Sequence, residues 1–155
     1  MKRRWIALPL AAAAAAAAVP VTAGHAQSSP RTITMTHGKE KMSFDDLAPK
    51  TIKRGRLSIG DRIVSQEQLL IDGKPAGTAH TDATITNSSP STFAHFTAVI
   101  QGAYKLADGV VFTSGYVDAA DGGDQETVIG GTGAYAGAHG TLTSDDKQTV
   151  VTLDG

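Results

Sequence analysis

The chain has 155 residues, a formal net charge of −1 at pH 7 and no cysteine. The lack of cysteine excludes disulfides, thiol nucleophiles and cysteine-based metal sites. Without Lys2, Arg3 and Arg4, 11 of the 14 basic residues remain against 15 acidic residues, a net charge of −4. This balance argues against a nucleic-acid surface, because such surfaces cluster lysine and arginine.

The first 26 residues have the features of a secretory signal peptide. A positive segment, Lys2–Arg4, precedes an apolar run over Trp5–Val19, and small-residue cleavage sites end at Ala23 and Ala26. The apolar run is shorter than the ~20 residues that span a bilayer. We therefore expect export to the periplasm or the cell exterior, no membrane association after cleavage, and one mature domain over residues 27–155.

Alternating polar and apolar residues separated by turn residues predict β-strands in most of the remaining chain. A first strand is expected at Arg31–Thr36, and seven more at 61–71, 76–86, 92–106, 110–118, 125–129, 141–144 and 148–153. Residues 37–59 are less regular, with one helical turn expected at Phe44–Pro49. Eight strands with short connections predict an all-β, eight-stranded antiparallel up-and-down barrel, because closure removes exposed strand edges. An open β-sandwich is the alternative.

A glycine-rich stretch follows the sixth expected strand. Glycines occupy positions 130, 131, 133, 137 and 140, and glycine enters the left-handed region without steric cost. The stretch predicts a strand that stops at Ile129, a tight turn, one short helical turn in Ala134–Ala138, and a further strand. A phosphate-binding loop is not indicated, because the Lys-Ser/Thr of that motif is missing.

The pattern Gly-Gly-Thr-Gly-x-Tyr-x-Gly-Ala-x-Gly at positions 130–140 resembles the glycine-rich turn of the allene oxide cyclase and dirigent superfamily. It most resembles the bacterial allene oxide cyclase barrel-like members. Gln101–Tyr104, Asp108-Gly109 and Thr113–Gly115 support this resemblance. It implies an eight-stranded calycin-like barrel, commonly a trimer, with an apolar cavity at one end. Relatives cyclise oxidised fatty acids or polyketides without a cofactor, or orient phenolic radicals.

The catalytic residues of the plant cyclases are not matched here. Those enzymes carry a glutamate in the first strand and a cysteine in the third. The expected first strand, Thr32–Thr36, contains no glutamate, and the cysteine position falls near Asp82. The resemblance therefore implies the fold and not the plant activity.

The same alignment, with strand alternation, turns one face of each of three strands toward the lumen. The implied catalytic residues are Asp82 as general acid or base, His80 beside it, and Tyr104 as a hydrogen-bond donor to a carbonyl oxygen. Asp82 and His80 could instead satisfy each other or face solvent. The implied ligand-binding residues are Thr84, Phe96, Ala98, Ile100, Val111, Thr113 and Val117.

The resulting lumen would be mostly apolar with a few polar groups, which suits a small apolar or aromatic ligand. The expected function is binding of such a molecule, with or without a cofactor-free cyclisation or isomerisation. The alternatives are a non-catalytic carrier and a structural barrel whose lumen is filled by Phe96, Ile100 and Met35. The scattered histidines predict no metal site. Phe112 and Tyr116 are expected to point outward, where they could form a homo-oligomer interface, a trimer or a dimer.

Overall fold

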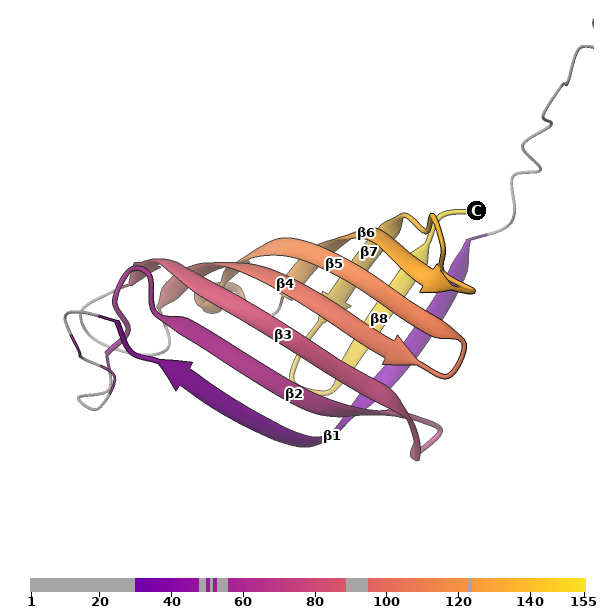
Figure 1. Ribbon diagram of the computed structural model, residues 1–155, viewed down its shortest axis with the longest axis horizontal. Coiled ribbons are helices and arrows are strands. Elements are labelled where there is room, and N and C mark those ends of the chain that lie inside the picture. The colour runs from indigo at the N-terminus through magenta and orange to yellow at the C-terminus, as the bar shows by residue number, and fades with distance from the viewer. Residues whose placement is uncertain (1–29, 48–49, 51, 53–55, 89–94, 123) are drawn as a thin grey trace, which may run out of the picture.

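The computed structural model describes residues 30–47, 50, 52, 56–88, 95–122 and 124–155. These residues form a closed barrel in which each strand pairs antiparallel with the next and β8 pairs with β1 (Figure 1). The strands are β1 (Arg31–Asp45), β2 (Arg62–Ile71), β3 (Lys74–Ser88), β4 (Phe96–Leu106), β5 (Gly109–Asp118), β6 (Asp124–Gly133), β7 (Gly140–Ser144) and β8 (Gln148–Leu153). The eight-stranded up-and-down barrel is confirmed, and the sandwich alternative is wrong. The expected signal peptide lies outside the described residues.

The first strand is longer than the sequence pattern predicts. β1 continues to Asp45, so the helical turn expected at Phe44–Pro49 is wrong at its start. The pairing of β1 with β2 shifts register between His37 and Glu40. This irregularity hides the strand from a period-two pattern, because it changes which alternate residues face inward. Met35 is buried before the shift, whereas Met42 and Phe44 face the lumen after it.

The glycine-rich stretch also differs from its prediction. β6 runs through the first glycines to Gly133, and residues 134–137 form successive turns in place of a helical turn. Gly133 has φ 61°, and a Cβ there would lie 2.3 Å from the carbonyl oxygen of Asp108. Glycine is therefore required for both its backbone angle and its close approach. A short 3-10 turn, η2 (Ala119–Asp121), lies instead in the acidic loop before β6.

Tyr135 packs into the lumen at the end of the barrel near the glycine-rich stretch. The side chain is 2% exposed and belongs to a cluster with Met35, Leu69 and other buried residues. Its hydroxyl donates a 2.7 Å hydrogen bond to Asp108. The guanidinium of Arg31 lies 5.5 Å from the ring centroid, a cation–π distance. This end of the lumen is therefore filled by side chains.

The other end of the barrel holds a second, smaller core that includes Leu57, Ile85 and Ala98. Asp61, which directly precedes β2, is fully buried there. Its carboxylate accepts hydrogen bonds from the backbone N–H groups of Leu47, at 2.8 Å, and Ser58, at 2.7 Å. These bonds satisfy backbone donors of the segment between β1 and β2.

The barrel wall is incomplete beside the second half of β1. β8 has six residues and pairs with β1 only over Arg31–Thr36, whereas β1 has fifteen. Beyond His37, β1 pairs with β2 alone. The short β7–β8 hairpin thus leaves a way into the lumen between β1 and β6. No helix among the described residues is long and apolar enough to cross a membrane.

Candidate functional site

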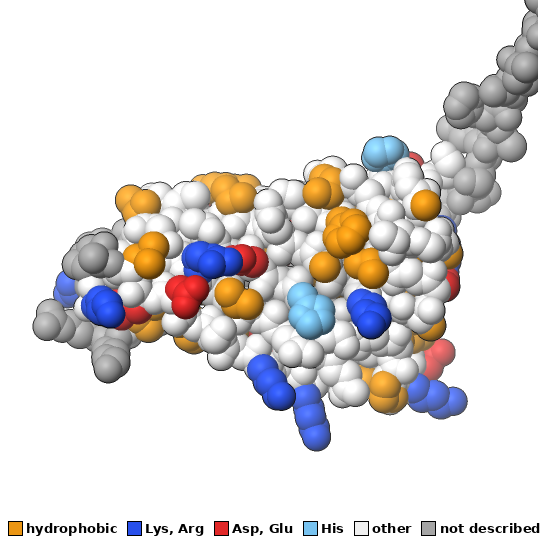
Figure 2. Space-filling view, viewed as in Figure 1, with side chains coloured by type: hydrophobic (Ala, Val, Ile, Leu, Met, Phe, Trp, Pro, Cys, Tyr) orange, Lys and Arg blue, Asp and Glu red, His pale blue; other side chains and the backbone are white. Residues whose placement is uncertain are grey.

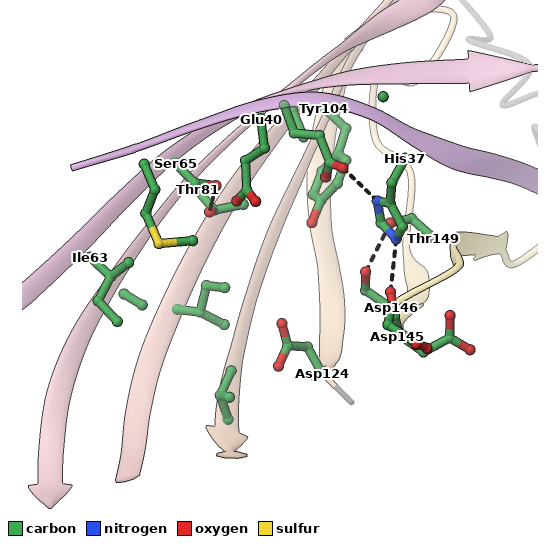
Figure 3. A pocket seen from close by; sticks show the side chains of 18 of the residues that line it. His37, Glu40, Ile63, Ser65, Thr81, Tyr104, Asp124, Asp145, Asp146 and Thr149 are labelled. Atoms are coloured by element: carbon green, nitrogen blue, oxygen red, sulfur yellow. Dashed lines mark hydrogen bonds and ion pairs between the residues drawn. The ribbon is translucent and has the colours of Figure 1, made fainter. Parts of the chain in front are cut away.

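A cavity of about 570 Å³ lies inside the barrel and opens on this incomplete side (Figure 3). This volume is within the range of ligand pockets. The lining comes from β1 to β6, the β7–β8 hairpin and β8. The lumen is therefore filled at one end and open at the other, as the family resemblance implied.

One side of the cavity is apolar. β1 and β2 contribute Met42, Phe44 and Ile63, and the next strands contribute Ala79, Ala83, Phe96, Ile100 and Val117. The two alanines leave room that larger side chains would occupy. Phe96 and Ile100, which were expected to close the lumen if it were filled, line the cavity without closing it. A flat ring system could pack against this wall through dispersion and the hydrophobic effect.

The opposite side is polar and centres on His37. The Nδ1 atom of His37 lies 2.8 Å from Oε1 of Glu67, which is an ion-pair distance. The two atoms are not aligned for a hydrogen bond. The Nε2 atom of His37 is 2.8 Å from the backbone carbonyl oxygen of Asp145, so it donates there when it carries a proton. Figure 3 shows His37 directly beside Asp145. This histidine ties β1 and β2 to the β7–β8 hairpin across the open side.

Two carboxyl groups on the cavity wall have raised pKa values. Burial raises the pKa of Glu67, Glu40 adds to the rise, and His37 opposes it. Burial alone raises the pKa of Asp124. Asp124 is half-buried, and its carboxylate makes no hydrogen bond or ion pair with another described residue. Raised carboxyl pKa values in a cleft are typical of groups that exchange protons with a ligand.

Tyr104 connects the cavity to a buried hydrogen-bond network. Its hydroxyl donates to Oε1 of Glu126 at 3.2 Å, and the Thr113 hydroxyl donates to Oε2 at 2.5 Å. Glu126 is 2% exposed. A Cβ at Gly102 would lie 2.4 Å from the Thr113 hydroxyl, and one at Gly115 would lie 2.9 Å from Cγ of Glu126. The two glycines therefore make the space that this network needs.

The Glu126 network predicts a measurable pH dependence of stability. Burial raises the pKa of Glu126, against the opposing hydrogen bonds from Thr113 and Tyr104. A raised folded-state pKa gives stability that is present below the unfolded value of about 4.5 and lost as pH rises through the folded value. Glu126→Gln should therefore flatten the loss of unfolding free energy as the pH rises from about 4.5 toward neutral. Urea denaturation of both proteins across this interval measures the difference, and parallel curves would contradict the assignment.

The residues predicted on β4 and β5 face the interior as expected. Tyr104, Phe96, Ile100 and Val117 line the cavity, and Ala98, Val111 and Thr113 are buried in the lumen. Their roles in binding or catalysis stay predictions.

The predicted orientation of β3 is wrong. His80 and Thr84 are exposed, and the Asp82 carboxylate lies on the outer wall, where Arg62 donates to it through Nε at 3.2 Å and through a second guanidinium nitrogen. Asp82 pairs with Gln101, which also faces outward, whereas Ala83 pairs with Ile100. Directly opposed residues share a face of a sheet. The inward residues of β3 are thus Ala79, Thr81, Ala83 and Ile85.

His37, Glu40, Glu67 and Asp124 were not among the predicted site residues. The register shift in β1 conceals His37 and Glu40, and Glu40 means that the observed first strand does contain a glutamate, contrary to the prediction. Glu67 shares its face with Ile63 and Leu69, and this spacing of two was the available signal. Among the described residues, no group of three or more His, Cys, Asp or Glu side chains could hold a metal ion.

The outer wall carries both charged and apolar side chains. Figure 2 shows acidic and basic groups beside one another on the visible face. Phe112 and Tyr116 point outward as predicted and are 40% and 58% exposed, and Val99, beside Tyr116, is 45% exposed. Val99 and Tyr116 are direct cross-strand partners on β4 and β5.

The barrel fold agrees with what a comparison with protein families finds. The model of the allene oxide cyclase barrel-like domain matches residues 32–153. The chain belongs to this family. The match includes all of β2 to β8 and nearly all of β1. A comparison with curated protein sequences finds no match.

Solved structures with the same barrel include enzymes that act on small organic molecules. Pyocyanin demethylase superposes with a TM-score of 0.67 at 21% identity, over 79% of this chain and 99% of that one. A heme-binding cyclase that catalyses a [4+2] cycloaddition in neoabyssomicin biosynthesis gives 0.58 at 14% identity, over 83% and 69% of the two chains. The Diels–Alderase AbmU from Streptomyces koyangensis gives 0.57 at 13% identity, over 86% and 72%. At these identities the likeness establishes the fold alone.

Proposed function

We propose that this barrel binds a small, mainly apolar or aromatic molecule in its lumen and guides a cofactor-free isomerisation or cyclisation of it. The observation that carries this proposal is the 570 Å³ cavity with an apolar wall on one side and the His37–Glu67 pair on the other. Ligand sites commonly combine an apolar surface with a few polar groups that fix orientation. The small-molecule chemistry of the demethylase and the Diels–Alderases adds support by analogy.

The two sides of the cavity have different roles in the proposed reaction. The apolar wall holds the ligand rings and excludes water, and confinement lowers the entropic cost of bringing reacting atoms together. Glu67 exchanges a proton with the ligand, and its raised pKa places the proton exchange closer to neutral pH. His37 positions the Glu67 carboxyl group. A proton removed from one ligand atom returns to another, so an isomerisation balances without an oxidant or a reductant.

Substitution of Glu67 separates an enzyme from a carrier. Native mass spectrometry of the protein isolated from its producing cells would identify a retained molecule, and conversion of that molecule would then be followed by chromatography. Glu67→Gln should lower turnover by roughly 100-fold or more, the usual contribution of a general acid or base, and change affinity little. Asp82→Asn on the outer wall is the matched control and should turn over normally. Full activity of Glu67→Gln would refute its catalytic role, and binding without any turnover would favour the carrier.

We also propose export and self-association. Lys2–Arg4 and the apolar run after it support export. Val99, Phe112 and Tyr116 provide an exposed apolar area on β4 and β5 that a second and third copy could cover. Light scattering on the purified protein tests association: a mass of two or three chains that falls to one chain with Tyr116→Ser supports it, and a monomer contradicts it.

A further inference from the structure

We infer that the ligand of this lumen carries a positive charge, as a protonated or quaternary amine or a cationic ring nitrogen. The inference rests on the proposed lumen binding and names the class of molecule bound. Among the described residues that line the cavity, none is lysine or arginine, whereas five are acidic: Glu40, Glu67, Asp124, Asp145 and Asp146. A cleft lined by charges of one sign concentrates the opposite charge.

Asp124 is the carboxylate best placed to meet a cation. It is half-buried at the start of β6, and no described residue forms a hydrogen bond or ion pair with its side-chain carboxylate. In Figure 3 it lies across the cavity from Tyr104. An unpaired, partly buried carboxylate loses solvation without receiving compensation from the protein. A ligand cation would supply that compensation.

Two other groups of the cavity, the Tyr104 hydroxyl and the Asp145 carboxylate, also present hydrogen-bond acceptors to a ligand. The hydroxyl proton of Tyr104 is directed to Glu126, so its oxygen presents lone pairs to the lumen. Backbone N–H groups of Lys147 and Gln148 bond to the Asp145 carboxylate and lower its pKa, which keeps it ionised. Among the described lining residues, His37 alone could carry a positive charge, and it is already paired with Glu67.

Three basic residues that are close to these acids in sequence or on neighbouring strands do not neutralise them. Lys41 pairs across strands with Gln66, and both are exposed on the outer face. Arg62 binds Asp82 and Asp45 on the outer wall. Lys147 is exposed at the tip of the β7–β8 hairpin and does not line the cavity. As far as the described residues go, these three basic side chains therefore leave the negative potential of the lumen available to a ligand.

Three probes that share a naphthalene ring system test which sign of ligand charge the cavity prefers. They are 1-naphthylmethyltrimethylammonium, 1-naphthylmethanol and 1-naphthaleneacetate, titrated into the full chain at pH 7.5 with fluorescence or calorimetric detection. The ammonium probe should bind at least about tenfold more tightly than the alcohol, the scale expected for one partly buried ion pair. The acetate should bind more weakly than both. Added salt should weaken the ammonium probe and leave the alcohol nearly unchanged.

A charge-matched pair of variants locates the effect. Asp124→Asn keeps the size of the side chain and should weaken ammonium binding by about tenfold with little change for the alcohol. Asp72→Asn removes the same charge from the exposed β2–β3 turn, where asparagine tolerates the φ of 51°, and should leave every affinity unchanged. Equal or tighter binding of the alcohol or the acetate would overturn the cation inference and keep lumen binding. If no probe binds and none perturbs the lumen, the proposed function fails as well.

Discussion

Replacing Tyr135 with alanine should lower the free energy of unfolding by about 4 kcal/mol, because a buried aromatic side chain is removed from the filled end of the lumen. Tyr135 is 2% exposed in a cluster to which all eight strands contribute residues. Its neighbours are held by strand pairing around the closed barrel, so the cavity left behind would collapse only in part. Guanidinium denaturation followed by circular dichroism measures the loss.

Two further variants separate the packing of Tyr135 from its hydrogen bond. Tyr135→Phe keeps the ring and loses the bond to Asp108, so it should cost about 1 kcal/mol. Tyr116→Ala removes an exposed ring of the same type, 58% exposed on β5, and should cost under about 1 kcal/mol in the monomer. Equal losses for Tyr135→Ala and Tyr116→Ala would show that Tyr135 does not fill the lumen.

Replacing Ala83 with tryptophan should weaken binding of the naphthalene probe by roughly 100-fold or more, about 2.7 kcal/mol. Ala83 lines the apolar side of the cavity opposite Ile100 on β4, and an indole there would occupy the space of the ligand rings. Titration of 1-naphthylmethyltrimethylammonium by calorimetry measures the loss, because the introduced tryptophan does not interfere with heat detection.

The neighbouring position supplies the control for this substitution. Thr84 lies on the same strand and is exposed on the outer wall, so Thr84→Trp adds the same group outside the barrel. The affinity of the Thr84→Trp variant for the probe should equal that of the unaltered protein. A similar loss in both variants would place the binding site on the outer wall, and no loss in either would place it away from β3.

The barrel itself was predictable from the sequence because most of its strands alternate and most of its turns carry glycine with aspartate. The Asp72-Gly73 and Asp108-Gly109 turns lie between strands as expected. The inward face of β4 was also predictable, since Ala98, Ile100 and Tyr104 alternate with exposed Val99, Gln101 and Lys105.

The predicted inward face of β3 is wrong because the prediction relies on one family position and not on the strand's own pattern of apolar and polar residues. Ala79, Ala83 and Ile85 are more apolar than His80, Asp82 and Thr84, and that contrast predicts the observed orientation. The pairing of Asp82 with Gln101, which faces outward, predicts the same orientation of β3. Agreement between hairpin partners is therefore a stronger guide than one position taken from a family resemblance.

The polar side of the site was harder to predict for a different physical reason. The register shift between His37 and Glu40 breaks the alternation of β1, so no local pattern shows that both residues reach the cavity. Asp124 lies at the end of an acidic loop whose residues look alike in sequence. Only closure of the barrel brings it opposite β1 and β2.

The most direct test of a ligand site in the lumen is nuclear magnetic resonance with methyl-labelled protein. Titration with 1-naphthylmethyltrimethylammonium should shift the methyl signals of Ala79, Ala83 and Ile100, which line the cavity. The methyl signals of Val99, on the outer face of β4, should stay in place. Shifts at Val99 with none at Ala79, Ala83 and Ile100 would contradict the account, because the molecule would then bind the outer wall.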